Sequence, residues 1–270
     1  QVKSSLMLAS MSSGNSIKIT EPKVTRDHTE RMIEYLDGFI ETSESSLGKT
    51  IFLKNSKLSK ISSYEVVGDF SSAAFIIVAA LISKNSKVLI KNVGLNKTRS
   101  GLLDILLKMN ADIEITNERM TCNEACGDIL VKSSELVGIE VPKKIIPNII
   151  DEIPILSIAA SFAEGKTVIK NALELKVKES DRLNATSMGL KAMNVKHEVL
   201  DDGLIINGSH DDIKIHNQIE SFGDHRIAMS FLIAGLRSKN GSIVKDCSNI
   251  ETSFPNFSKI MNSLGMNINE

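Results

Sequence analysis

Apolar residues gather in runs that are apolar on nearly every side of a helix. Such runs cover residues 72–81, 155–160 and 227–236, and each is followed by a polar turn and a short segment rich in β-branched residues. A helix that is apolar nearly all round must be buried. A layer of such helices beneath strands builds an α/β or α+β domain. The pattern therefore predicts buried helices covered by a layer of strands.

The order of helix, strand and second, amphipathic helix recurs along the chain, which predicts four copies of one unit. The matching positions Asn92, Asn171 and Asp246 are spaced 79 and 75 residues apart. A period of this length corresponds to a whole supersecondary unit. The alternative is a coincidental likeness between helix–turn–strand segments. The predicted segments are helix 6–9, strand 16–20 and helix 26–36; helix 72–81, strand 88–91, helix 99–109 and strand 112–115; helix 155–160, strand 167–170 and helix 182–193; and helix 227–236, strand 242–245 and helix 254–266.

Residues 41–63 differ from their surroundings because they are rich in Ser and Lys and poor in large apolar residues. Such a segment is typical of a strand pair that leads into a linker. A domain boundary is expected near Val67, so that residues 1–66 and residues 67–270 form two domains. Residues 1–10 are interpreted as the start of a buried helix. Because the chain opens on Gln1 and not on Met, we expect that natural sequence precedes it.

The composition excludes several classes of protein. A net charge of −1, with 42% hydrophobic and 24% charged residues, predicts a globular protein without a global field for nucleic acid or membranes. No run approaches the roughly 18 apolar residues of a membrane span. Three cysteines are too few for a disulfide framework and favour a reducing compartment. Cys122 and Cys126 are interpreted as loop thiols, with half a metal site as the alternative. His197, His210 and His216 are expected at the surface.

Short polar signatures precede the buried helices and carry the candidate chemistry. Asp69, Asp151 and Asp224 each stand where such a helix begins, and Pro154 suits a first helical turn. Several helices that start on one side would direct their positive N-terminal ends at one region, which is a ready anion site. The alternative is that these residues are only helix caps. Arg99 is expected to be an ordinary surface residue, whereas the basic candidates for binding are Lys3, Arg26, Lys178, Arg182 and Arg226, and the acidic candidates are Asp151 and Glu179.

Two charged segments are distinctive, Lys-Glu-Ser-Asp-Arg at 178–182 and Gly-Asp-His-Arg-Ile-Ala-Met at 223–229. Together with further segments in order along the whole chain, they resemble the signatures of the 3-phosphoshikimate 1-carboxyvinyltransferase (EPSP synthase) family, and these two are the most specific. UDP-N-acetylglucosamine enolpyruvyltransferase shares the family's fold but fits these two segments poorly. The other matching segments are Gln-Val-Lys-Ser at 1–4, Thr-Arg-Asp-His-Thr-Glu at 25–30, Gly-Asp-Phe-Ser-Ser-Ala at 68–73 and Asp-Glu-Ile-Pro at 151–154.

The resemblance implies the two-domain enolpyruvyl transferase fold, with three βαβαββ units in each domain and the active site in the cleft between them. The chain is identified as an N-terminally truncated member, so residues 1–66 would be the end of the first domain. The implied reaction transfers the enolpyruvyl group of phosphoenolpyruvate to the 5-hydroxyl of shikimate 3-phosphate and releases phosphate. It requires no metal or other cofactor. A cytoplasmic monomer is expected, with these two small molecules as its partners.

The resemblance also implies roles for single residues. Asp151 resembles the group that contacts the shikimate hydroxyls and takes the 5-hydroxyl proton, and Glu179 the acid that protonates the methylene carbon of phosphoenolpyruvate. Lys178 resembles a shikimate ligand and proton-transfer partner. Arg182 and Arg226, with His225 beside them, resemble the ligands of phosphoenolpyruvate. The remaining implied contacts are Gln1 with both substrates and Arg26 with the shikimate phosphate, while Lys3 is included as a basic candidate.

The chain departs from the family pattern at two places. The family's N-terminal Lys and Arg ligands and its Asn-Ala-Gly-Thr segment are absent, and Thr252 stands where some members carry a Lys. Four alternatives to a complete transferase therefore stay open. They are an inactive fragment that retains partial substrate binding, an enzyme similar to UDP-N-acetylglucosamine enolpyruvyltransferase, a protein similar to RNA 3′-phosphate cyclase, and a non-enzymatic binding module.

Overall fold

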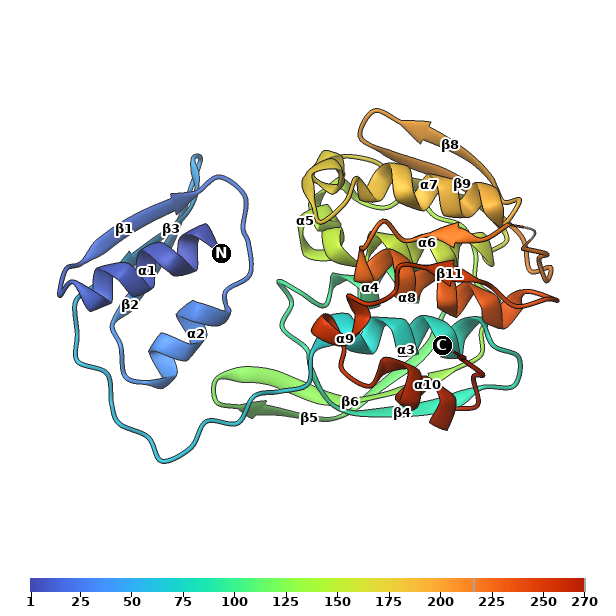
Figure 1. The fold of residues 1–270 in the computed structure, drawn as a ribbon. Coiled ribbons are helices and arrows are strands. Elements are labelled where there is room, and N and C mark those ends of the chain that lie inside the picture. The colour runs from blue at the N-terminus through green and yellow to red at the C-terminus, as the bar shows by residue number, and fades with distance from the viewer. Residues whose placement is uncertain (216, 270) are drawn as a thin grey trace.

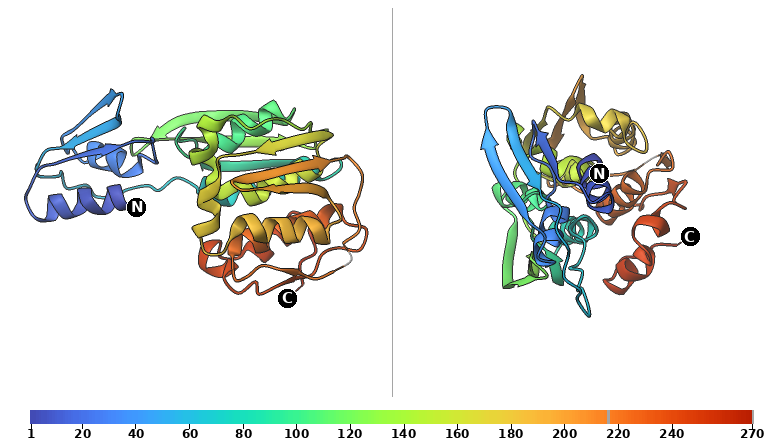
Figure 2. Two further views of the ribbon diagram at one scale, coloured as in Figure 1. Left: turned by 90° about the horizontal axis from the view of Figure 1, so that it is seen from above. Right: turned by 90° about the vertical axis from the view of Figure 1, so that its left-hand side faces the viewer.

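A computed structural model describes residues 1–215 and 217–269 of the chain, which form two lobes (Figure 1). His216, which was expected at the surface, lies outside the described residues. The smaller lobe has its own core around Met7, Ile33, Ile51 and Leu53. A second and much larger core holds the remaining residues together. Figure 1 and the left view of Figure 2 both show the lobes side by side, joined by an extended linker.

The smaller lobe is one helix-and-strand unit. Its strands pair antiparallel in the order β1-β3-β2, so the third strand in sequence lies in the middle. The expected buried helix at the start of the chain is only half buried, because Met7 packs into the core while Val2 and Leu6 are exposed. The elements are α1 (Val2–Ser12), β1 (Ile17–Glu21), α2 (His28–Tyr35), β2 (Ile40–Ser45) and β3 (Gly48–Leu53).

The larger lobe contains two more units with the same plan. Their sheets have the strand orders β4-β6-β5 and β7-β9-β8, again with the last strand of each unit in the centre. The first unit comprises α3 (Phe70–Ile82), β4 (Lys87–Gly94), α4 (Gly101–Lys108), β5 (Asp112–Thr121) and β6 (Glu124–Lys132). The second comprises η1 (Lys143–Ile145), α5 (Ile146–Ile149), η2 (Ile150–Glu152), α6 (Ile153–Ser161), β7 (Gly165–Ile169), η3 (Leu173–Val177), α7 (Arg182–Ala192), β8 (Lys196–Leu200) and β9 (Gly203–Gly208).

A last and partial unit closes the chain. Its short strands β10 and β11 pair in parallel. The helix expected over 254–266 is shorter and covers only Phe257–Ser263, because Pro255 is followed by Asn256 in the left-handed conformation, with φ of 63°. Its elements are β10 (Ile219–Glu220), α8 (His225–Ala234), η4 (Gly235–Arg237), β11 (Val244–Lys245), α9 (Ile250–Ser253) and α10 (Phe257–Ser263).

The predicted repeat is visible in the backbone. Asn92, Asn171 and Asp246, the positions matched in the sequence, have positive φ values of 55°, 62° and 57°. In two of the copies the backbone N–H at this position donates to a carboxylate, from Asn92 to Asp128 and from Asn171 to Asp202. The left-handed conformation favours Asn and Asp, which explains why these two residue types occupy the matched positions.

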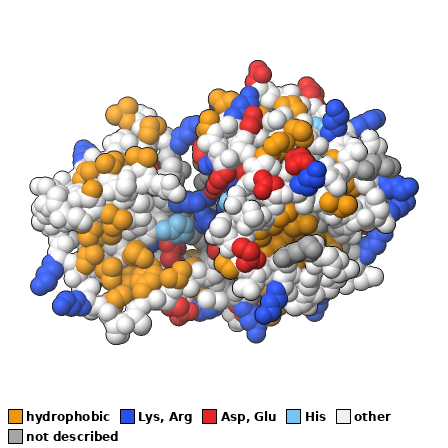
Figure 3. Space-filling model, viewed as in Figure 1, with side chains coloured by type: hydrophobic (Ala, Val, Ile, Leu, Met, Phe, Trp, Pro, Cys, Tyr) orange, Lys and Arg blue, Asp and Glu red, His pale blue; other side chains and the backbone are white. Residues whose placement is uncertain are grey.

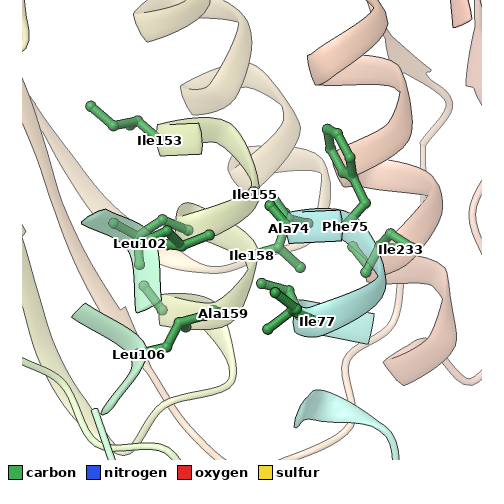
Figure 4. Close-up of a cluster of buried hydrophobic side chains, with 14 of the residues drawn as sticks. Ala74, Phe75, Ile77, Leu102, Leu106, Ile153, Ile155, Ile158, Ala159 and Ile233 are labelled. Atoms are coloured by element: carbon green, nitrogen blue, oxygen red, sulfur yellow. The ribbon is translucent and has the colours of Figure 1, made fainter. Parts of the chain in front are cut away.

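The three apolar helices α3, α6 and α8 pack against one another in the centre of the larger lobe. Figure 4 shows Ala74 and Ile77 of α3 facing Ile155 and Ile158 of α6, with Ile233 of α8 close by. These side chains are almost completely buried, as the apolar pattern predicted. In Figure 1 the three helices start on the side of the smaller lobe. None of the helices within 1–215 and 217–269 is long and apolar enough to cross a membrane.

Three side chains expected at the surface are partly buried and hydrogen-bonded. The His197 ring contacts the Ser187 hydroxyl at 2.8 Å and the Val195 carbonyl at 2.9 Å, and His210 Nε2 lies 2.7 Å from the Leu136 carbonyl. Arg99 is 17% exposed because it pairs with Asp69 at 2.7 Å. The surface prediction was therefore wrong for these three residues. The partners of His210 and Arg99 are distant in the sequence, so local composition does not reveal them, whereas those of His197 are two and ten residues away.

Candidate active site

The carboxylate of Asp151 lies where four cationic side chains meet. Oδ2 accepts a hydrogen bond of 2.5 Å from Arg26 Nη2, and Oδ1 accepts one of 3.1 Å from Arg182 Nη1. The Lys178 ammonium lies 3.5 Å from Oδ1. Arg226 Nη1 donates to the Asp151 carbonyl oxygen at 3.0 Å. Five residues that were predicted as site residues are thus brought together, one of them from the smaller lobe.

The charges around Asp151 control its ionisation. Burial by itself would raise the pKa of Asp151, but the positive charges of Arg226, Lys178 and Arg26 outweigh burial and hold this pKa far below its ordinary value. The carboxylate is therefore ionised throughout the physiological range. Without bound anions it is a strong hydrogen-bond acceptor and a weak base.

Arg182 is the most completely paired of the cations. Its side chain is 1% exposed, and its three nitrogens each donate to a different carboxylate. Nε lies 2.8 Å from Asp224, Nη1 3.1 Å from Asp151 and Nη2 2.6 Å from Glu179. Burial would raise the pKa of Asp224, but hydrogen bonding and charge from Arg182 lower it overall. Arg182 consequently has a structural role in holding three carboxylates together, in addition to any role in binding a ligand.

Arg226 is held differently, through a carboxylate that the sequence analysis did not single out. Its Nη1 lies 3.2 Å from Oε1 of Glu152, whose side chain is 1% exposed. The same Oε1 accepts a hydrogen bond from the Ser71 hydroxyl. The only available sequence signal was position, since Glu152 adjoins Asp151 at the start of a buried helix and a buried acid needs a partner.

Lys178, Glu179 and His225 line the more open side of the cluster. Lys178 also pairs with Glu174 at 2.6 Å, and Glu179 is 54% exposed. His225 is partly buried in the first turn of α8. Burial lowers the pKa of His225, and the neighbouring Arg226 lowers it further. His225 is therefore a neutral imidazole at physiological pH.

The predicted convergence of helix N-termini is confirmed. The Asp69 side chain caps α3 by accepting from Ser72 N, and Asp224 caps α8 by accepting from the backbone N–H of Arg226. Asp181 caps α7 in the same way. Contacts of Ser71, Glu152, Arg182 and Asp224 tie the first turns of α3, α6, α7 and α8 together. These helix ends add positive potential to that of the cations.

Lys3 and Gln1 lie outside this cluster. The Lys3 ammonium is 8% exposed and pairs with two carboxylates of its own lobe, Glu30 at 2.6 Å and Glu21 at 3.1 Å. Gln1 is exposed at the N-terminus of α1, and its side chain forms no capping hydrogen bond. In Figure 1 this end of α1 faces the larger lobe.

The residues that follow Arg26 bind the smaller lobe to the larger one. Asp27 accepts hydrogen bonds from Asn96 Nδ2 at 2.6 Å and Thr98 Oγ1 at 3.3 Å. The His28 ring lies 2.6 Å from Glu124 Oε1. Glu124 ends the turn of the β5–β6 hairpin, which extends toward α2 in Figure 1. Three successive residues thus each contact a different part of the larger lobe.

A pocket of about 340 Å³ lies beside these contacts, between the lobes. Its wall includes Arg26, His28 and Glu124 together with apolar residues of the linker such as Val66 and Val67. Figure 3 shows the hollow between the lobes, with Lys, Arg and His side chains at its edge. In the part of the chain that the structure describes, no group of His, Cys, Asp and Glu side chains is arranged to hold a metal ion.

Comparison with known proteins gives consistent results. A family model described as EPSP synthase (3-phosphoshikimate 1-carboxyvinyltransferase) matches residues 1–261. A 3-phosphoshikimate 1-carboxyvinyltransferase of Magnetococcus marinus is 43% identical over 270 residues, which is all of this chain and 60% of the relative. One of Petrotoga mobilis is 45% identical over 264 residues, covering 98% of this chain and 60% of the relative. The chain thus spans about three-fifths of the length of the curated relatives that it matches.

Solved structures show the same likeness. An EPSP synthase from Acinetobacter baumannii superposes with a TM-score of 0.90 and 38% identity, covering all of this chain and 61% of the other. The enolpyruvyl transferase NikO from Streptomyces tendae gives a TM-score of 0.73 with 16% identity, covering 98% of this chain and 60% of the other. At that identity the second likeness supports the fold alone.

Proposed function

This chain belongs to the EPSP synthase family, and from that premise we propose that it carries the Asp151-centred part of an active site for enolpyruvyl transfer. The transfer runs from phosphoenolpyruvate to the 5-hydroxyl of shikimate 3-phosphate, with release of phosphate. The observation that carries the proposal is the convergence of three cations, Arg26, Lys178 and Arg182, on the Asp151 carboxylate beside the hollow between the lobes. A fourth cation, Arg226, donates to the carbonyl oxygen of the same residue.

The proposed reaction needs such a concentration of cations because both substrates are anions. Two like unit charges about 4 Å apart repel by about 4 kcal/mol at an effective dielectric constant near 20. Guanidinium groups bind phosphate and carboxylate through paired donors, and the joined helix ends add to the attraction. A net charge of −1 for the whole chain supplies no such attraction, so it must be local.

Anionic substrates would also change the behaviour of Asp151. Once the substrates take up Lys178, Arg26 and Arg226, these cations stabilise the Asp151 carboxylate less, and its pKa rises. A carboxylate that is a weak base in the free protein thus becomes a better acceptor for the 5-hydroxyl proton when both substrates are bound. General bases work best with a pKa near the working pH.

Glu179 is proposed as the acid that protonates the methylene carbon of phosphoenolpyruvate. It is 54% exposed, so substrate can reach it, and Arg182 Nη2 holds it at 2.6 Å. Addition of the 5-hydroxyl across the double bond of phosphoenolpyruvate requires a base at the attacking oxygen and an acid at the methylene carbon. Lys178 directly precedes Glu179 in the sequence, and its ammonium lies 3.5 Å from Asp151 Oδ1. This position suits a proton-transfer partner.

We also propose that residues 1–66 are one unit of a second domain built like the larger lobe. The support is the likeness of α1-β1-α2-β2-β3 to the α3-β4-α4-β5-β6 unit, with the same strand order. In the larger lobe α3 packs against α6 and α8, whereas Val2 and Leu6 of α1 are exposed. Equivalent helices of that domain would cover this face. A cytoplasmic location and a monomeric state are part of the same proposal, and light scattering would test the second.

The test is a turnover assay of the 270-residue chain with both substrates, following phosphate release. Glu179→Gln should lower turnover by at least about 100-fold, in line with typical general-acid contributions. Asp112→Asn, which removes a 53% exposed carboxylate that pairs with Lys132, is the matched control and should leave turnover unchanged. Unchanged turnover in the Glu179 variant would exclude it as the acid.

A second candidate is substrate binding without turnover. It is favoured by one fact, that the chain spans 60% of the relatives' length. Titration calorimetry with shikimate 3-phosphate separates the candidates, because a chain that binds without turnover gives heat of binding but releases no phosphate. Absence of both would overturn the proposed function for this chain.

A further inference from the structure

Glu152 uses the two oxygens of its buried carboxylate very differently. Oε1 accepts from the Ser71 hydroxyl and from Arg226 Nη1. Oε2 is buried and accepts no hydrogen bond from the residues that the structure describes. A buried acceptor without a partner is destabilising. Natural sequences retain such local conflicts mainly at functional sites, which indicates that Glu152 is retained for what its Oε1 does.

That task concerns the orientation of Arg226. Both N–H groups of its Nη1 are used, one by the Asp151 carbonyl at 3.0 Å and one by Glu152 Oε1 at 3.2 Å. Its Nε and Nη2 donate to none of the described residues, whereas all three nitrogens of Arg182 are paired. A guanidinium is planar and rigid. Two contacts at one corner therefore set the direction of the donors that stay available.

Glu152 is itself anchored by the first turn of α3. Besides donating to Glu152, the Ser71 hydroxyl accepts from Arg99 Nη2 at 2.9 Å, and the same nitrogen lies 2.7 Å from Asp69. Glu152 precedes α6, and Arg226 belongs to α8. The Glu152 carboxylate thus connects α3, α6 and α8. Its contact with Ser71 helps to fix its position.

We propose that Glu152 is a positioning residue, which fixes one edge of Arg226 so that Nε and Nη2 face the anionic group of phosphoenolpyruvate. This inference rests on the proposed function for the identity of the anion. The part that concerns the orientation of Arg226 stands independently of it. Glu152 is separate from the residues that the resemblance implies, all of which would touch substrate.

The test compares Glu152→Ala, Glu152→Gln and the control Asp112→Asn in the full chain. Gln retains an oxygen that can accept from Ser71 and Arg226, whereas Ala retains none. We expect the Kd for phosphoenolpyruvate, measured with shikimate 3-phosphate present, to rise at least about 10-fold in the Ala variant. The Gln variant should stay within about 3-fold of the wild type, and the Kd for shikimate 3-phosphate should not change.

A second measurement reports on Arg226 directly. The guanidinium NMR signal of Arg226, assigned by its loss in Arg226→Lys, should show restricted rotation in the wild type and the Gln variant and free rotation in the Ala variant. If Glu152→Ala does not fold, Ser71→Ala replaces it, because it removes the anchor of Oε1 and keeps the carboxylate. It should give the same changes in smaller degree.

The outcomes are distinct. An unchanged Arg226 signal in the Ala variant would overturn the inference, as would a changed signal with an unchanged Kd for phosphoenolpyruvate. Equal weakening of both substrates would indicate general loosening of the site and would also overturn it. If the wild type binds no phosphoenolpyruvate but the signal changes as expected, the proposed function fails and the orientation of Arg226 by Glu152 is supported.

Discussion

Nη2 of Arg26 lies 2.5 Å from Oδ2 of Asp151, and this contact joins two residues that are 125 positions apart in the sequence. It connects the smaller lobe to the centre of the cation cluster. Arg26 is 38% exposed, whereas Asp151 is 16% exposed. The exposed partner can therefore be exchanged for a ligand anion, while the buried carboxylate stays in place. The Arg26–Asp151 ion pair thus both joins the two lobes and helps to keep the Asp151 carboxylate ionised.

Replacing Asp151 with Asn should destabilise the protein in a pH-dependent way. The pKa of Asp151 is lower in the folded protein than its ordinary value. Its contribution is therefore complete above the ordinary value of about 4 and is lost as the pH falls further. At pH near 7 the variant should lose about 3 kcal/mol of unfolding free energy, because Arg26, Lys178 and Arg182 lose their common carboxylate partner. Denaturation in urea measures this difference.

Urea denaturation at acid pH should give a different result from that at neutral pH. The difference between Asp151→Asn and the wild type should shrink as the pH is lowered from about 5. A difference that stays constant between neutral and acid pH would contradict the assignment. Asp112→Asn provides the comparison, because its carboxylate is half exposed and pairs only with Lys132.

Arg182→Ala should destabilise the fold more than Arg226→Ala does. Loss of Arg182 leaves Asp224, which is completely buried, without its charged partner. Removing one member of a buried ion pair costs about 3–5 kcal/mol. Among the residues that the structure describes, Arg226 has one carboxylate partner and is 12% exposed, so its removal should cost about half as much. Urea or thermal unfolding of both variants measures the order.

Weaker phosphoenolpyruvate binding by Arg182→Ala could therefore result from loss of stability and not from loss of a ligand contact. Arg182→Lys keeps one charge but cannot reach three carboxylates at once. It should therefore recover only part of the lost stability. Equal stability of the Arg182→Ala and Arg226→Ala variants would show that the three contacts of Arg182 do not act together.

The contact of His28 with Glu124 should couple the two lobes. Glu124 is 10% exposed, and its second oxygen accepts from Asn96 at 3.1 Å. A double-mutant cycle with His28→Ala and Glu124→Ala should give a coupling free energy of about 0.5–1 kcal/mol, reduced by the 41% exposure of His28. Hydrogen exchange of the linker 54–67 should become faster in both single variants. Purely additive effects would rule out the coupling.

His225 should titrate below the ordinary histidine value of about 6.5. Burial lowers its pKa, and the charge of Arg226 lowers it further. Arg226→Met should therefore move the pKa of His225 upward, which the ring proton signals measure directly. Because the folded state resists protonation of this group, His225 reduces stability as the pH falls below its ordinary value. Lys191→Met, which removes an exposed charge of α7, should leave the titration unchanged.

Much of the fold follows from local patterns. Runs without a polar face could only be buried helices, and α3, α6 and α8 are buried as expected. Asp69 and Asp224 cap helices because their oxygens accept from backbone groups a few residues away. The repeat was likewise visible, since three of the copies carry Asn or Asp at the matching position, where the backbone is left-handed.

Local patterns predicted which segments form buried helices and where those helices begin, because both depend on interactions within one or two helical turns. The pairing of the charges at the helix ends depends on how the helices pack. Lys3 pairs with Glu21 and Glu30 inside the smaller lobe. Arg182 pairs with three carboxylates, and Glu152 pairs with Arg226. Neighbours in such a cluster are distant in sequence, so the geometry of packed helices selects each partner.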